Sequence, residues 1–171
     1  MNLFNKTRIA FTLAEVLVTL MIIGVIAALT IPTLLQNIDN QQNKVAWKKA
    51  YSDLENATRK VLQDNGGTFK DLCNTGSSDC FKKAYEKYFN VVKSCDDGYT
   101  NGNCWHANGV QKYLDGTPVP DEWNGFSSFV LNNGTLIDFN FKKECDRTDW
   151  GLVNGQASCG IIYVDVNGFK G

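Results

Sequence analysis

Several residues and motifs that enzymes commonly use are scarce or missing in this chain of 171 residues. The chain has one histidine, His106, so any nucleophile–histidine pair would depend on that single imidazole. The Gly-x-Ser-x-Gly elbow, the Gly-x-Gly-x-x-Gly turn and the phosphate-binding loop are all absent from the sequence. The carboxylates form no pair suggestive of acid–base chemistry. The sequence therefore predicts a protein that is not an enzyme and uses no cofactor.

The charge of the chain is nearly balanced, with 17 Lys and Arg against 18 Asp and Glu and a formal net charge of −1. No block of like charges occurs along the sequence. A nucleic-acid-binding surface would need a cluster of basic side chains to neutralise phosphates. Nucleic acid and acidic substrates are therefore disfavoured as partners.

Cysteines are well represented, and all of them lie downstream of an apolar amino-terminal segment. An even number of cysteines behind a membrane-inserting segment favours disulfides in an oxidising compartment. Zinc is the alternative, but there is no Cys-x-x-Cys pair and His106 has no partner at ligand spacing. We expect disulfides and no metal, and among the many possible connectivities we favour the pairing of consecutive cysteines. The six are Cys73, Cys80, Cys95, Cys104, Cys145 and Cys159.

The apolar segment covers residues 8 to 35, RIAFTLAEVLVTLMIIGVIAALTIPTLL. About 20 apolar residues in a helix are enough to cross the hydrocarbon core of a bilayer. After Arg8 the segment holds one charged side chain, the carboxylate of Glu15. A charge at membrane depth costs about 2.5 kcal/mol or more, so it usually marks function rather than packing.

Three interpretations of this segment compete. A cleaved secretory signal peptide fits the basic residues Lys6 and Arg8, but its apolar region is only about 7–15 residues long. A plain single-pass anchor fits the length, and the positive-inside rule leaves Lys6 and Arg8 in the cytoplasm. That anchor, however, gives no reason for Glu15.

The third interpretation rests on the block AFTLAEVL at residues 10 to 17. This block resembles the cleavage signal of the type IV pilin and type II secretion pseudopilin family, whose short basic leader is cut just before a phenylalanine. The resemblance implies cleavage between Ala10 and Phe11, release of residues 1 to 10, and methylation of the new amino terminus on Phe11. Glu15 then occupies the family's glutamate position. The chain departs from the family in having Ala10 where glycine is usual.

The resemblance also gives roles to Glu15, Gly24 and Pro32 in assembly. Cleavage exposes a charged amine on Phe11, and the carboxylate of Glu15 in one subunit would pair with the amine of the next and set the axial register. Gly24 and Pro32 fall where pilins carry residues that loosen the helix. Because proline lacks the backbone donor and clashes with the preceding turn, a kink is expected near residues 28 to 32.

The function implied by the resemblance is structural. The chain would be a subunit of a type IV pilus-like or type II secretion pseudopilus filament, first held in the cytoplasmic (inner) membrane as a single-pass protein with its head outside. Its partners would be like subunits, the prepilin peptidase and the inner-membrane assembly platform with its ATPase. A minor pilin of a DNA-uptake or secretion machine is an alternative within the family. Another is a membrane-tethered extracytoplasmic binding domain that does not polymerise, whose loop aromatics hold a ligand such as a glycan; these aromatics are Tyr99, Trp105, Tyr113 and Trp123.

Beyond the transmembrane and assembly helix of residues 11 to 35, apolar residues keep recurring three or four positions apart. They predict an amphipathic continuation over residues 36 to 66, ended by Gly66 and Gly67. Residues 67 to 171 should form a globular head that covers the single apolar stripe of this helix. The stripe comprises Leu35, Ile38, Val45, Trp47, Ala50, Tyr51, Leu54, Ala57, Val61 and Leu62.

The head is expected to combine one short helix with an antiparallel sheet. The stretch FKKAYEKYFNVV, residues 81 to 92, has an aromatic helical face, which we assign to the core. SSFVL and TLIDFNF flank Asn132-Asn133-Gly134, a strong hairpin signal, and GIIYVDV supplies a third strand. The fold class is therefore α+β, a long helix packed on a small sheet in a pilin-like, disulfide-containing head. The residues expected to face the helix are Phe129, Leu131, Leu136, Ile137, Phe139, Ile162 and Val164.

The segment from Asp165 to Gly168 faintly resembles the carboxyl-terminal calcium loops of some pseudopilins. Calcium requires about six or more oxygen ligands, usually with several carboxylates. Asp165, even with Asp138 or Asp146, offers too few. We therefore expect a simple turn after the third strand and no metal.

Overall fold

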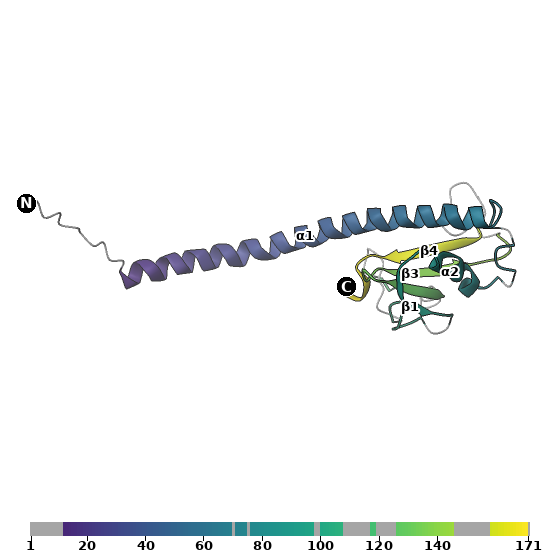
Figure 1. Cartoon of the computed structure of the whole chain (residues 1–171). Coiled ribbons are helices and arrows are strands. Elements are labelled where there is room, and N and C mark those ends of the chain that lie inside the picture. The colour runs from purple at the N-terminus through teal and green to yellow at the C-terminus, as the bar shows by residue number, and fades with distance from the viewer. Residues whose placement is uncertain are drawn as a thin grey trace, which may run out of the picture. The chain divides into compact units, whose positions relative to one another are not determined.

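The computed structural model describes residues 12–69, 71–74, 76–97, 100–107, 117–118, 126–145 and 158–170. The predicted α+β class is confirmed: one long helix precedes a short helix and a small antiparallel sheet (Figure 1). The elements are α1 (Leu13–Asp64), α2 (Ser78–Glu86), β1 (Val91–Cys95), β2 (Ser127–Leu131), β3 (Leu136–Phe141), β4 (Gly160–Asp165) and the 3-10 helix η3 (Gly168–Lys170).

Helix α1 has 52 residues, and Pro32 lies inside it without ending it. The helix stops where the sequence predicts, because Gly66 and Gly67 take positive φ angles of 68° and 86°. The N–H of Gly67 donates to the carbonyl of Leu62 at 2.6 Å and closes the last turn. The chain divides into two compact units, Met1–Lys44 and Val45–Gly171, and α1 contributes to both.

Within the second unit, α1 presents two different sides. One side is buried in the core at positions three and four residues apart, as an amphipathic helix requires. The prediction of a single covered stripe is wrong for Val45, Trp47 and Tyr51, whose side chains are exposed. Each residue turns the helix by about 100°, so Val45 lies on the side away from the core-facing line and Tyr51 lies beside it. Trp47, seven residues before Leu54, lies close to that line and is exposed nonetheless. The core-facing line comprises Ala50, Leu54, Ala57 and Val61.

The sheet is an antiparallel meander in the order β1-β2-β3-β4. The predicted hairpin between β2 and β3 is confirmed, and Gly134 in its turn has a φ of 86°. Phe129 pairs with Ile137, and Phe139 pairs with Ile162, so these four side chains share one face of the sheet.

Strand β1 is absent from the sequence prediction, which has only three strands. The stretch expected to be helical over residues 81 to 92 is divided, since α2 ends at Glu86 and the strand begins at Val91. The β-branched side chains of Val91 and Val92 favour extended backbone. Pairing with β2, in which Cys95 lies opposite Ser128, then supplies the hydrogen bonds that a local pattern cannot reveal.

Both faces of the sheet are covered at β3, where all six residues are buried. Leu136 was expected to face the helices together with Ile137, and this is wrong, because neighbouring residues on a strand point to opposite faces. Leu136 is fully buried on the face away from the helices. Val164, paired with Ile137, lies on the helix side and is half-buried.

Helix α2 supplies the aromatic centre of the core, as predicted. The ring of Phe81 lies 4.9 Å from that of Phe141 and 5.1 Å from that of Tyr85, measured between centroids. The hydroxyl of Tyr85 lies 3.1 Å from that of Thr58 in α1, which ties the two helices together. Burial raises the pKa of Tyr85, and the hydrogen bond with Thr58 acts in the opposite sense.

We expect two phenylalanine substitutions to lower the free energy of unfolding by very different amounts. Phe139 is fully buried, so Phe139→Ala should lower the free energy of unfolding by about 3–5 kcal/mol. Phe169 is 54% exposed, and Phe169→Ala should cost less than about 1 kcal/mol. Urea unfolding of the full chain in detergent micelles measures both. Equal losses of unfolding free energy in the two variants would contradict the burial of Phe139 in the core.

Candidate functional site

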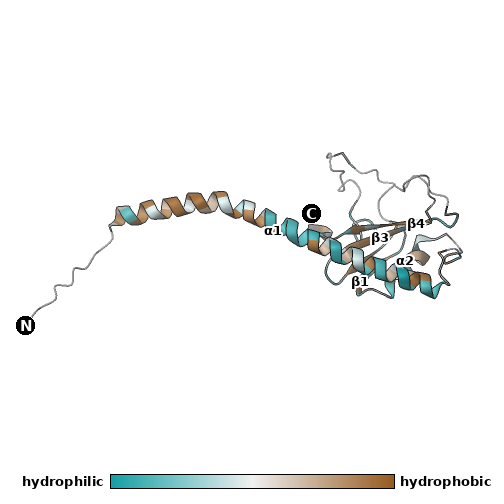
Figure 2. Cartoon of the chain, turned by 90° about the horizontal axis from the view of Figure 1, so that it is seen from above, coloured by the Kyte–Doolittle hydropathy of each residue, from teal (hydrophilic) through white to brown (hydrophobic). Residues whose placement is uncertain are grey.

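The amino-terminal part of α1 is apolar on all its sides (Figure 2). Leu20, Met21, Ile22 and Ile23 are consecutive, so they point around the whole circumference of the helix, and all four are exposed. Within the described residues α1 is the one helix long and apolar enough to cross a membrane, and none of its apolar window is buried inside the chain. A helix that is apolar all round needs apolar surroundings. These must come from outside the chain.

The first turn of α1 gives Glu15 a local role that the sequence prediction missed. The carboxylate oxygen Oε2 of Glu15 accepts from the backbone N–H of Thr12 at 2.8 Å and from its hydroxyl at 2.9 Å. The N–H of Glu15 donates to the hydroxyl oxygen of Thr12 at 3.3 Å. This reciprocal arrangement is a capping box, and its signature, Thr-x-x-Glu, is present in the sequence. Glu15 therefore closes the start of the apolar helix.

Gly24 and Pro32 lie farther along the same helix. At a rise of about 1.5 Å per residue, Gly24 is about 13 Å and Pro32 about 25 Å from Glu15 along the axis, so the structure does not gather the three into one site. A Cβ added at Gly24 would meet no atom within 4 Å. Near Pro32 the hydroxyls of Thr30 and Thr33 donate to the carbonyls of Ile26 and Thr30, both at 2.9 Å, a bonding pattern that favours bending of helices.

The six cysteines pair consecutively in the structure, the arrangement that the sequence favours. The Cα atoms of Cys73 and Cys80 lie 5.8 Å apart, and those of Cys95 and Cys104 lie 6.0 Å apart. The third pair is Cys145 with Cys159. Three disulfides in the second unit indicate an oxidising, extracytoplasmic environment for the head.

The turn after β4 engages both carboxylate oxygens of Asp165. Oδ1 accepts from the N–H groups of Asn167 at 2.8 Å and Gly168 at 3.2 Å. Oδ2 lies 2.6 Å from Nε2 of His106. In the described part of the chain, no three His, Cys, Asp or Glu side chains gather into a group that could hold a metal ion. Asp165 thus organises a turn and contacts His106.

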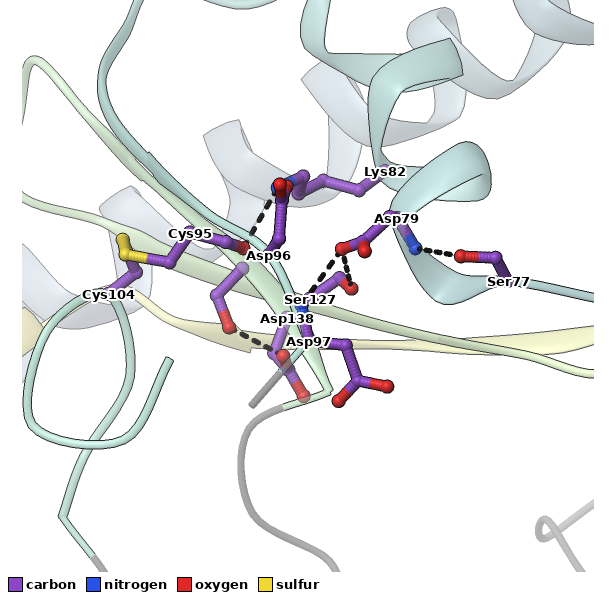
Figure 3. A network of polar contacts seen from close by, with 10 residues as sticks. Ser77, Asp79, Lys82, Cys95, Asp96, Asp97, Cys104, Ser127 and Asp138 are labelled. Carbon is purple, nitrogen blue, oxygen red and sulfur yellow. Dashed lines mark hydrogen bonds and ion pairs between the residues drawn. A yellow bond between two sulfur atoms is a disulfide. The ribbon is translucent and has the colours of Figure 1, made fainter. Parts of the chain in front are cut away.

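A polar network ties α2 to the strands (Figure 3). Lys82 of α2 is fully buried, and its Nζ donates to the carbonyl of Cys95 at 2.8 Å and to Oδ1 of Asp96 at 2.7 Å. Hydrogen bonding from Lys82, helped by its charge, lowers the pKa of Asp96. Asp79, also in α2, accepts from the N–H of Asp97 at 2.9 Å and from the hydroxyl of Ser127 at 2.5 Å.

Asp138 is a buried carboxyl group of the sheet, and among the described residues it has no ion-pair partner. Its Oδ1 accepts from the hydroxyl of Ser128 at 2.5 Å and from the N–H of Phe126 at 3.1 Å. Its Oδ2 is buried and has no hydrogen-bond partner in the part of the chain that the structure describes. Burial raises the pKa of Asp138 to about 7, with the hydrogen bonds from Ser128 and the backbone acting in the opposite sense. The sequence offers no signal for this, because the burial comes from the second covered face.

Several predicted site residues lie outside the described residues: the cleavage and methylation residues Ala10 and Phe11, the loop aromatics Tyr99, Tyr113 and Trp123, and Asp146. The remaining loop aromatic, Trp105, is 4% exposed, so its ring is part of the interior rather than a binding surface. Searches among protein-family models, curated proteins and solved structures found no match to this chain.

We expect alanine substitutions of two neighbouring lysines in α2 to affect the stability of the chain very differently. Lys82→Ala removes a buried ammonium, leaves the carbonyl of Cys95 without its donor and should lower the free energy of unfolding by about 2–3 kcal/mol. Lys83 is exposed, so Lys83→Ala should leave the stability unchanged. Thermal unfolding of the full chain distinguishes them. A Lys82→Ala chain as stable as the wild type would refute the structural role of the network.

Proposed function

We propose that this chain is a structural subunit of a type IV pilus-like or type II secretion pseudopilus filament. It is processed from a prepilin by cleavage after Ala10 and methylation of Phe11. The main support for the proposal is the exposed apolar part of α1, whose first turn is capped by the carboxylate of Glu15. Its partners are like subunits, the prepilin peptidase and the inner-membrane assembly platform.

The apolar surface of α1 requires apolar surroundings at two successive stages, in the membrane and in the filament. Full burial of one large apolar side chain is worth about 1.5–3 kcal/mol, so exposing this helix to water would cost far more than a domain's stability. Lipid covers the helix while the subunit waits in the inner membrane with its head outside. Identical helices cover the same surface in the filament. The head, whose disulfides favour an oxidising side, remains outside the lipid.

Glu15 serves the proposed assembly in two ways. Within its own chain it caps the helix through Thr12. The carboxylate keeps its negative charge for the amine that cleavage creates on Phe11 of a neighbouring subunit. Because unpaired charges are costly among apolar helices, this pairing sets the axial register of the filament.

The proposal predicts the chemical nature of the mature amino terminus. Mass spectrometry of the chain from its native membrane should find a protein that starts at methylated Phe11 and lacks residues 1 to 10. A chain that keeps Met1 and its leader would contradict the proposal and favour a membrane-tethered binding domain.

Two substitutions at one position separate the capping role of Glu15 from its charge. Glutamine also serves in a capping box, so Glu15→Gln keeps the local hydrogen bonds and removes the charge, whereas Glu15→Ala removes both. Cleavage should proceed in both variants, and filament yield in the sheared fraction should fall at least about tenfold in both, equivalent to about 1.4 kcal/mol.

Assembly of Glu15→Gln at the wild-type level would show that the cap matters and that the register pairing is wrong. Normal assembly of both variants would leave Glu15 with no role in the filament. Thr12→Ala is the matched control for the cap, because it removes the capping hydroxyl and preserves the carboxylate.

A further inference from the structure

Residues 100–107, the covering segment, are attached to the face of the sheet away from the helices, and β3 is buried on that face too. The segment is attached to both edge strands of the sheet, β1 and β4. Cys95 of β1, bonded to Cys104, lies opposite Ser128 and therefore shares a face with it. At the other edge, Asp165 of β4 binds His106 of the segment at 2.6 Å.

Asp138 lies between these two anchors. It pairs with Ser128 on one side and with Tyr163 of β4 on the other, so its side chain belongs to the covered face. A segment tied to β1 through Cys104 and to β4 through His106 must pass over the central strands. Lys93 of β1 adds a third tie, since its Nζ donates to the carbonyl of Asn103 at 3.1 Å.

The layer between the covering segment and the sheet is polar and incompletely paired. In the described residues, three buried side-chain polar atoms have no hydrogen-bond partner: Oδ2 of Asp138, Nε1 of Trp105 and Oγ1 of Thr100. All three residues belong to the covering segment or to the face beneath it, and each is at least 96% buried, since Trp105, the most exposed, is 4% exposed. Buried polar groups are normally paired, so such a cluster marks a layer that is easily entered by water.

We propose that the covering segment is a proton-controlled flap that lies closed over neutral Asp138 and lifts when Asp138 ionises. In neutral Asp138, Oδ1 accepts from Ser128 and Phe126, and the group left unpaired at Oδ2 carries no charge. Ionised Asp138 presents a bare buried charge at Oδ2, and hydrating it requires water beneath the segment. Opening exposes the indole of Trp105.

The burial of Asp138 sets the direction of the response. A carboxyl whose pKa is raised in the folded state, here to about 7, stabilises the closed fold below its unfolded value of 3.8 and loses that contribution as the pH rises through about 7. In the described residues, the other titratable groups on the covered face or in the covering segment are Lys93, His106, Tyr163 and Asp165.

The test follows the exposure of Trp105 in the full chain, held in detergent micelles. The other tryptophans are removed by Trp47→Phe, Trp123→Phe and Trp150→Phe, and quenching of the remaining fluorescence by acrylamide is measured from pH 5 to 8.5. We expect the quenching constant to rise at least about threefold with a midpoint near the folded pKa of Asp138, about 7. Circular dichroism over the same range should stay constant, because the segment lifts without global unfolding.

Two variants attribute the rise to Asp138. Asp138→Asn keeps an acceptor for Ser128 and cannot ionise, so its quenching should stay low at every pH. Ser128→Ala removes a donor that favours the ionised form and should move the midpoint to higher pH. Asp97→Asn, at an exposed carboxylate, is the control and should behave as the wild type. A flat wild-type profile, or a rise that persists in Asp138→Asn or disappears only in His106→Gln, would overturn the proposal.

Discussion

An apolar helix without a partner in its own chain is the constraint on which the rest of this structure depends. The amino-terminal part of α1 exposes large apolar side chains around its whole circumference. The continuation of the same helix, from Val45 onward, is covered by α2 and the sheet on one side only. Folding of the head therefore covers part of α1, and the apolar amino-terminal part requires apolar surroundings from outside the chain.

The head is organised to hold the end of that helix firmly. Aromatic side chains from α2 and the sheet enclose Ala57 and Val61, and the hydroxyl of Tyr85 meets that of Thr58. Lys82 and Asp79 tie α2 to the strands, while three disulfides close short loops around this centre. The opposite face of the sheet is less completely paired, and the buried carboxyl group of Asp138 lies there.

Local patterns were enough to predict much of this fold. The helix stop at Gly66, the hairpin at Gly134 and the pairing of consecutive cysteines all depend on residues close together in the sequence. Strand β1 could not be predicted, because its pairing with β2 joins segments more than 30 residues apart. Burial of Leu136 and Asp138 depends on a second layer over the sheet, which no alternation within one strand reveals. The capping box of Thr12 and Glu15 is local as well, because Thr-x-x-Glu before an apolar run is its sequence signature.

We propose that lipid and then identical helices cover the exposed apolar surface of α1. A photoreactive amino acid placed at Met21 or Leu29, which are 72% and 71% exposed, tests this claim directly in cells that produce the filament. Irradiation should yield adducts at twice the mass of the chain and above in the sheared filament fraction, and lipid adducts in the membrane fraction. Chains recovered from the soluble fraction, with no adduct to a second copy, would contradict the account.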